Sequence, residues 1–249
     1  MDNDFVLLVF AGFAAQLVDG ALGMGFGIVG TTIMLWIGLT PAHASALVHF
    51  GEVFTTGASG LSHMAMRNID WRYVRRLAPA GMAGGGLGAY GLAEFDGEAI
   101  RPLVMAYLAL MGGLIILRAW RGAAGPTVRA PLRLGFLGFF GGFLDATGGG
   151  GWGPIVTTTL LEEGRAPRLV IGSVNLTEFF VTTTISATFI LSLGIGDIRP
   201  ILGFLIGGVL AAPLAGVITR VAPATTLRIA VGSFVLIVTA LQTYKLVTS

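Results

Sequence analysis

Four carboxyl side chains lie well inside apolar stretches of the sequence, where an ionisable group is costly and is a functional candidate by default. They are Asp19, Glu52, Asp145 and Glu178. Every Lys and Arg falls at the end of an apolar stretch, so none of the four has an obvious buried cationic partner. We therefore expect these carboxyls to carry protons or bind a cation, and to couple or gate the movement of a solute. For the two Asp a structural role is the alternative, because each can accept N–H bonds where a helix begins.

Glycine runs follow both Asp residues, at 23–27 and at 148–153. A half-helix that begins at such a run presents bare N–H groups and the positive end of its dipole, which suits an oxyanion. With nearby hydroxyl and amide groups, the predicted anion-binding residues are Gly23, Gly25, Gly27, Thr31, Gly149, Gly150, Gly151, Thr157 and Asn175. Close helix packing is the alternative reading of the glycines. His49 could relay protons, and a polar group satisfied within the bundle is the alternative for it.

The composition places these groups in a membrane protein. Of 249 residues, 54% are hydrophobic and 11% are charged, whereas a soluble domain carries about a quarter charged residues. The apolar stretches are about 20 residues long, which matches a hydrocarbon core of roughly 30 Å. The chain is therefore predicted to sit in a lipid bilayer, and its net charge of +2 does not indicate nucleic-acid binding. It has no cysteine for a disulfide or a thiolate metal site, and we predict no cofactor.

An internal repeat relates the two halves of the chain. At an offset of 126 residues, the separation of Asp19 and Asp145, Glu52 also aligns with Glu178 without a gap. Two Asp and two Glu drawn from only 13 acidic residues would not be expected to coincide by chance. We predict a first transmembrane repeat over 1–120, a cytoplasmic linker over 121–131 and a second repeat over 132–249.

The first segment of each half is predicted to be broken. As one straight helix, residues 5–37 would measure about 50 Å, far more than the bilayer core. If the broken segments at 5–37 and 132–161 re-enter, each half adds three crossings and the two halves are inverted. The N-terminus then lies outside, and of the 15 Lys and Arg only Arg101, Arg199 and Lys245 lie outside. The positive-inside rule favours this model over a single crossing of each broken segment. The expected fold is an all-α polytopic membrane protein with two inverted repeats.

Two short motifs are only weak evidence for an enzymatic function. Residues 25–30 match a dinucleotide-binding pattern, but no soluble strand precedes them. Residues 57–60 are similar to a rhomboid-type nucleophile motif around Ser59, yet all three histidines lie in the segment of Ser59 itself. No base from another helix is then available to activate the serine, and we predict that the protein is not an enzyme.

The second glycine run carries a resemblance to a known family. Residues 138–145 followed by 148–154 resemble the glycine-rich signature of the sulfite exporter TauE/SafE family, also called the toluene sulfonate uptake permeases. A weaker echo at 12–30 is similar to the first repeat of that family. The resemblance implies secondary transport of sulfur-containing anions or organosulfonates, or sulfite export, at a bacterial inner membrane.

Together these features predict a permease that moves a small oxyanion, such as sulfite or an organosulfonate, by alternating access. The carboxyl of Glu52 or Glu178 would carry a proton with the anion. A cation carrier for sodium or a divalent metal, with the four carboxyls as ligands, is the alternative. The expected partners are the small anion and the lipid bilayer, and glycine faces such as 81–88 leave a homodimer open.

Overall fold

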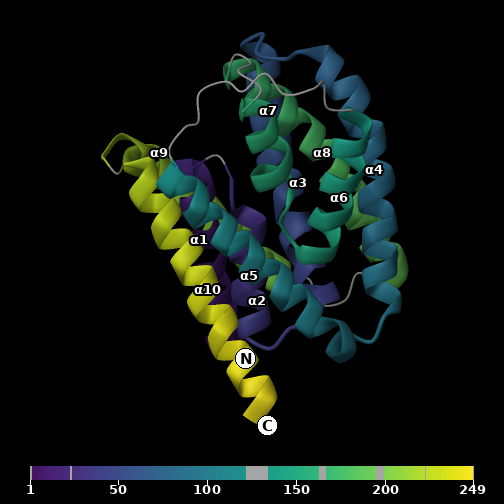
Figure 1. Ribbon diagram of the computed structural model, residues 1–249, viewed down its shortest axis with the longest axis vertical. Coiled ribbons are helices and arrows are strands. Elements are labelled where there is room, and N and C mark those ends of the chain that lie inside the picture. The colour runs from purple at the N-terminus through teal and green to yellow at the C-terminus, as the bar shows by residue number, and fades with distance from the viewer. Residues whose placement is uncertain are drawn as a thin grey trace.

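The computed structural model describes residues 2–22, 24–121, 134–162, 167–194, 199–221 and 223–248, and these residues form helices joined by turns (Figure 1). Three of the described helices are long and apolar enough to cross a membrane, over Gly97–Arg121, Pro167–Leu193 and Thr225–Leu246. The predicted all-α polytopic fold is confirmed. Gly23 and all of the predicted linker after Arg121 lie outside the described residues.

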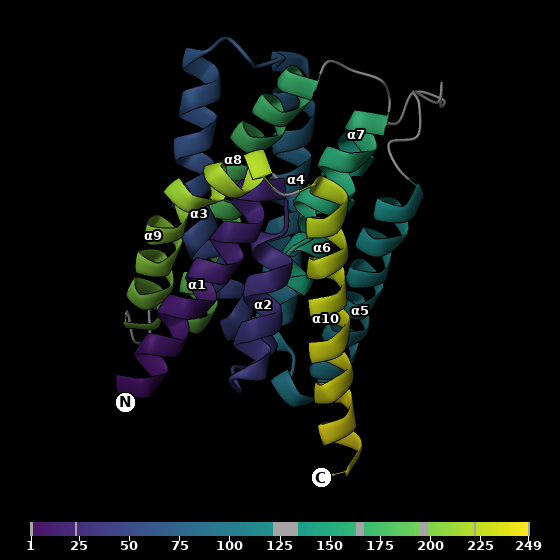
Figure 2. The same ribbon diagram turned by 90° about the vertical axis from the view of Figure 1, so that its left-hand side faces the viewer.

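Two helical hairpins with unwound tips occupy the predicted broken segments. In the first, α1 (Asp2–Leu22) is followed by α2 (Phe26–Trp36). In the second, α6 (Leu134–Gly148) is followed by the π-helical turn η1 (Trp152–Thr157), which continues into α7 (Thr158–Glu162). Figure 2 shows α2 running back toward the end from which α1 starts, and α7 running back toward the start of α6. Both segments therefore turn back within the bundle.

The half-helices after the breaks begin differently in the two hairpins. Helix α2 has 11 residues and ends before a turn in which Gly38 adopts a φ of 100°. The second half-helix starts as a π-helical turn that contains Pro154. Proline has no N–H to donate to the preceding turn, which disfavours regular α-helical hydrogen bonding there.

Six longer helices complete the bundle: α3 (Pro41–Ala65), α4 (Trp71–Glu94), α5 (Gly97–Arg121), α8 (Pro167–Leu193), α9 (Arg199–Val221) and α10 (Ala224–Thr248). Helix α3 pairs with α8 and α5 pairs with α10 (Figures 1 and 2). Helix α1 lies along α9, and α4 lies along α6. In each of these four pairs one helix precedes residue 121 and the other follows it, so the predicted halves interleave. Their inverted relation stays a prediction.

Glycines set the spacing of the α1–α9 and α4–α6 pairs. Gly12 of α1 faces the backbone of Phe204, and Gly84 of α4 faces the backbone of Phe139. A Cβ at either position would overlap the facing carbonyl oxygen. In a bilayer, where no hydrophobic effect pulls helices together, such close approach supplies the van der Waals contact that holds them.

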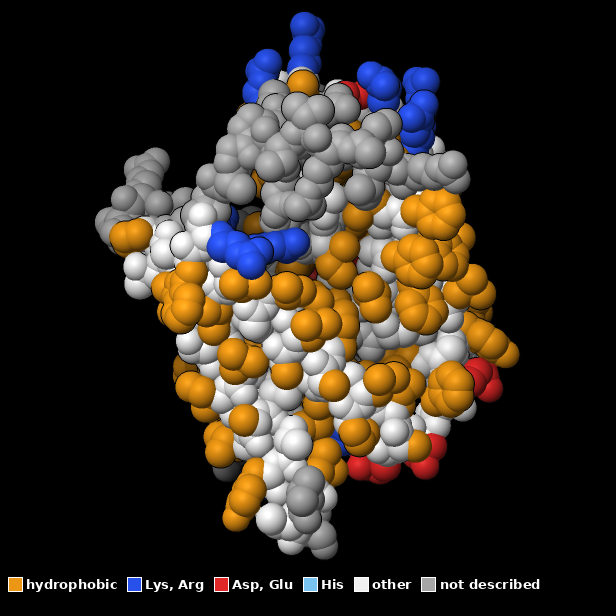
Figure 3. Space-filling model, viewed as in Figure 1, with side chains coloured by type: hydrophobic (Ala, Val, Ile, Leu, Met, Phe, Trp, Pro, Cys, Tyr) orange, Lys and Arg blue, Asp and Glu red, His pale blue; other side chains and the backbone are white. Residues whose placement is uncertain are grey.

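Charge separates to the two ends of the molecule. Figure 3 shows most of the visible Lys and Arg side chains at one end, with a further basic cluster part of the way down, and most of the acidic side chains at the other end. Hydrophobic side chains cover most of the surface between the ends. The basic end carries Arg72, Arg75 and Arg76 in the exposed first turns of α4, and the acidic end carries Glu94 and Asp96 where α4 ends. This is the charge distribution expected of a protein that crosses a bilayer.

We predict that Gly84→Ala destabilises the protein by about 1–3 kcal/mol, because its Cβ would meet the backbone of α6, which cannot move aside locally. Gly91→Ala on the same helix is the control, since nothing lies within 4 Å of its Cβ position. Thermal unfolding of the two variants in detergent should show a lower midpoint for Gly84→Ala only. Equal midpoints would mean that the α4–α6 contact is looser than described.

Candidate functional site

The two unwound tips meet backbone to backbone. Gly27, in the first turn of α2, lies against Gly149 and Gly150, and a Cβ on Gly27 would come within 2.6 Å of the Cα of Gly150. The Thr31 hydroxyl donates to the carbonyl of Gly149 at 2.9 Å and links the tips. Gly149 has a φ of 67°, a conformation that favours glycine. The glycine runs that the sequence places 126 residues apart therefore form one junction.

Both Asp residues that precede the breaks accept backbone N–H bonds. Asp145 Oδ1 accepts from Gly151 at 2.6 Å and from Trp152 at 3.0 Å. Asp19 Oδ1 accepts from Phe26 at 3.3 Å. The structural alternative considered for these carboxyls is thus present in the geometry. As a consequence, three of the amides expected to face an anion are already paired.

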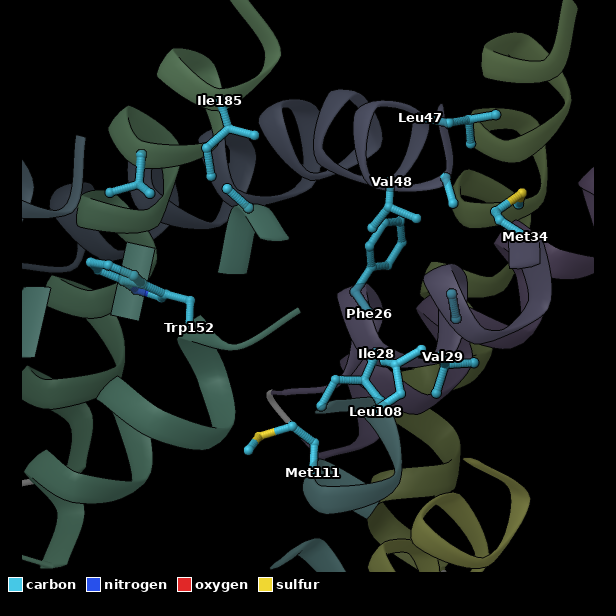
Figure 4. Packing of buried hydrophobic residues seen from close by; sticks show 14 of the residues in the cluster. Phe26, Ile28, Val29, Met34, Leu47, Val48, Leu108, Met111, Trp152 and Ile185 are labelled. Atoms are coloured by element: carbon cyan, nitrogen blue, oxygen red, sulfur yellow. The ribbon is translucent and has the colours of Figure 1, made fainter. Parts of the chain in front are cut away.

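Buried aromatic side chains anchor the start of each half-helix. Phe26 and Trp152 occupy equivalent positions in the predicted repeat, and both are buried. Figure 4 shows the ring of Phe26 beside Val48 of α3. Trp152 and Val181 of α8 both pack against Gly81 of α4. Large apolar rings at these positions fix the direction in which each half-helix leaves its break.

Helix α5 supports the second break from the side. The Tyr107 hydroxyl donates to the Gly150 carbonyl at 2.9 Å, and the Arg118 guanidinium donates to the Pro154 carbonyl. The Gly150 carbonyl lies in the non-helical stretch, where no helix supplies a partner, and Pro154 lies in the helical turn that follows. Sequence reasoning missed both residues, since nothing in the local pattern of α5 indicates that it passes this break.

A cavity of about 290 Å³ opens where the two breaks face α3 and α8. Its wall includes backbone from both glycine runs and many polar side chains. The polar side chains are Gln16, Asp19, Thr55, Thr56, Glu52, Ser59, His63, Asp145, Asn175 and Glu178. All four intramembrane carboxyls are among them. Within the described part of the chain, no Lys or Arg lines this cavity.

The predicted anion-binding residues divide into two groups. Those that line the cavity are Gly25, Gly27, Gly150, Gly151 and Asn175. Those that do not line it are Thr31, Gly149 and Thr157, of which Thr31 and Thr157 are buried in the surrounding core. Their roles toward a solute stay predictions, as does that of Gly23, which lies outside the described residues.

Neutral donors face the cavity from α3 and α8. Asn175 Nδ2 donates one hydrogen to the Ile171 carbonyl at 3.0 Å, which leaves its second N–H for another partner. Ser59 also lines the cavity, together with His63 one turn further along α3. Sequence reasoning weighed Ser59 only as a protease nucleophile, because the approach of α8 to this face of α3 cannot be read from the sequence.

His49 lies behind the cavity wall, fully buried on α3. Its Nε2 is 3.4 Å from Asp145 Oδ2 and 3.9 Å from Glu52 Oε2. Its Nδ1 is 2.8 Å from the carbonyl of Ser45. The predicted relay residue thus contacts two of the four carboxyls, in a cluster that can hold a proton or a cation.

A second cavity of about 580 Å³ lies at the opposite end of the α3–α8 pair. Along α3, residues between 52 and 63 line the first cavity and residues between 43 and 50 line the second. Along α8, which runs antiparallel to α3, residues between 171 and 178 line the first cavity and residues between 186 and 193 line the second. The rings of Phe26 and Phe204 meet between these levels with centroids 5.2 Å apart, and both pack against Gly51.

Comparisons with known proteins agree with this architecture. A family model described as "Sulfite exporter TauE/SafE" matches residues 8–242. A probable membrane transporter protein of Bacillus subtilis (strain 168), YtnM, is 38% identical over 244 residues, which cover 94% of this chain and 81% of that protein. No solved structure matches the chain significantly. The chain is therefore a multi-pass membrane transporter, not an enzyme, and it belongs to the sulfite exporter TauE/SafE family.

Proposed function

We propose that this transporter moves a small sulfur-containing oxyanion, such as sulfite or an organosulfonate, across the bacterial inner membrane by alternating access and in company with protons. The observation that carries the proposal is the cavity at the junction of the two breaks, whose wall holds four carboxyls and neutral donors. Membership of the family suggests the class of solute. The carboxyls that line the cavity suggest that transport of the anion is coupled to protons.

Charge makes proton uptake a condition for anion binding. At an effective dielectric constant of 20, two like charges 4 Å apart repel by about 4 kcal/mol. An anion beside several ionised carboxyls would face that penalty more than once, with no Lys or Arg among the described lining residues to offset it. Once protons neutralise the carboxyls, the Ser59 hydroxyl and the free N–H of Asn175 can bind the anion without repulsion. The anion and the proton then enter together.

Of Glu52 and Glu178, Glu178 is the better placed proton carrier. Its side chain is only partly buried and lines the cavity, whereas Glu52 and Asp145 are 4% and 1% exposed. A proton can therefore reach Glu178 from the solution side of the cavity. Asp145 is also held by two backbone N–H groups, which favours a structural role for it.

The two cavities at opposite ends of the α3–α8 pair support alternating access. Each reaches the level of the Phe26–Phe204 contact from a different side. A shift of the hairpins against this pair could open one cavity while it closes the other, with the solute held at the junction. The basic end of the molecule would face the cytoplasm, and the N-terminus would lie outside.

We expect purified protein in liposomes to accumulate sulfite in response to a proton gradient. With one proton per anion, a gradient of one pH unit contributes 1.36 kcal/mol and raises accumulation about tenfold. Glu178→Gln should abolish this dependence, because an amide cannot carry the proton. Glu94→Gln, at an exposed carboxyl outside the cavity, is the matched control. Accumulation that ignores the gradient in the unmodified protein would contradict the coupling.

Alternating access is open to a labelling test because the chain has no cysteine. Ser59→Cys introduces a thiol in the first cavity and Ser186→Cys in the second. In oriented membrane vesicles, a small membrane-impermeant thiol reagent should reach Cys at 59 from the basic side and Cys at 186 from the opposite side. Addition of sulfite should change the two rates in opposite directions. Labelling of both from one side would rule out the two-cavity scheme.

A cation carrier is the second candidate, and the four carboxyls around one cavity favour it. In that case sodium or a divalent metal would be the solute itself. Liposomes loaded with a cation-sensitive dye separate the two candidates. We expect no entry of Na⁺ or Mn²⁺ driven by its own gradient in the absence of an oxyanion, and such entry would favour the cation carrier.

A further inference from the structure

Three side-chain atoms without a hydrogen-bond partner converge behind the cavity wall. They are His49 Nε2, Glu52 Oε2 and Asp145 Oδ2, and each is buried. One atom from each residue lies within 4.8 Å of the others. The side chains are 0%, 5% and 2% exposed, so bulk water does not compensate for the missing partners. Leaving buried polar groups unpaired in this way is costly.

The surroundings of His49 determine which of its nitrogens can act as a ligand. A backbone carbonyl can only accept, so the contact of 2.8 Å with Ser45 requires that Nδ1 carries the hydrogen and donates it. Neutral His49 then presents a bare lone pair at Nε2. Asp145 is oriented in a similar way, because Oδ1 accepts two backbone N–H bonds and Oδ2 is left over. Three acceptor atoms therefore face one another.

We propose that these three atoms bind a divalent cation of the first transition row, such as Zn²⁺ or Mn²⁺. One imidazole nitrogen and two carboxylate oxygens form a donor set that suits such ions. Around an ion with bonds of about 2.1 Å in tetrahedral geometry, the donors lie roughly 3.4 Å apart. The separations from His49 Nε2, 3.4 Å and 3.9 Å, are close to that spacing. A ligating His that donates its other N–H to a backbone carbonyl is also usual at metal sites.

The position of the site suggests a structural role for the ion. His49 and Glu52 are three residues apart and share one face of α3, while Asp145 belongs to α6 just before the second break. The ion would fasten α3 to that break. Because Glu52 and Asp145 also line the cavity, its charge would be felt by a solute there. Only this last consequence, a positive charge for the oxyanion, rests on the proposed function.

Calorimetry on the purified full chain tests the site, with ZnCl₂ and MnCl₂ titrated into protein that has been treated with a chelator. We expect one ion per chain. Glu52→Gln and His49→Gln each remove one ligand and should weaken binding on the order of 100-fold. Glu178→Gln removes a carboxyl from the same cavity and His43→Gln removes a histidine from the same helix, and both should bind as the unmodified protein does.

The titration of the unmodified protein is by itself a sufficient test of the proposed metal site. The test therefore still works if a variant fails to fold. If neither ion binds with a stoichiometry of one per chain, the inference is wrong. A proton shared among the three acceptor atoms would then take the place of a metal. Equal loss of binding in Glu178→Gln or His43→Gln would place the ion elsewhere. A chain that transports sulfite but binds no metal overturns this inference alone. A chain that binds one ion but moves no anion overturns only the proposed function.

Discussion

The structure depends on the direct contact between two stretches of backbone in the interior of the bundle. Gly27 and the Gly149–Gly150 pair approach so closely that no side chain fits between them. This contact brings the carboxyls that precede the two breaks to one cavity, and it places the N-terminal ends of α2 and η1 on the wall of that cavity. A side chain at Gly27 would force the tips apart and disperse the groups that line it.

Unwound backbone at this depth must find its partners within the protein, because lipid offers none. The chain supplies them from several helices at once. Asp19 and Asp145 accept the exposed N–H groups, while Thr31 and Tyr107 donate to the exposed carbonyls of Gly149 and Gly150. Burial of these polar side chains would be unfavourable elsewhere in a membrane protein. Here they form hydrogen bonds with the unpaired backbone groups at the breaks. Three of the amides at the breaks are therefore paired within the protein.

Much of this arrangement could be predicted from the sequence. The membrane setting, the positions of both breaks and the four carboxyls inside apolar segments follow from hydropathy, glycine runs and the offset that aligns Glu52 with Glu178. The sequence indicates the pairing of the amides with Asp145 only as one of two alternatives, because the chain after a glycine run can take several courses of similar free energy. The contributions of Tyr107 and Ser59 could not be predicted. They arise from which helices become neighbours, and in lipid that choice is made by shape rather than by a pattern of polar and apolar residues.

The cross-pairing of helices has a consequence for how the protein is made. Helix α1 leaves the ribosome long before α9, the helix along which it finally lies, has been synthesised. The α1–α2 hairpin must therefore stay in or near the bilayer before α9, its neighbour in the folded protein, is present. A similar delay separates the synthesis of α3 from that of α8. Assembly of the interior has to follow insertion of nearly the whole polypeptide. Truncated or stalled chains should accordingly expose unwound backbone to lipid, and membrane quality control would be expected to recognise them.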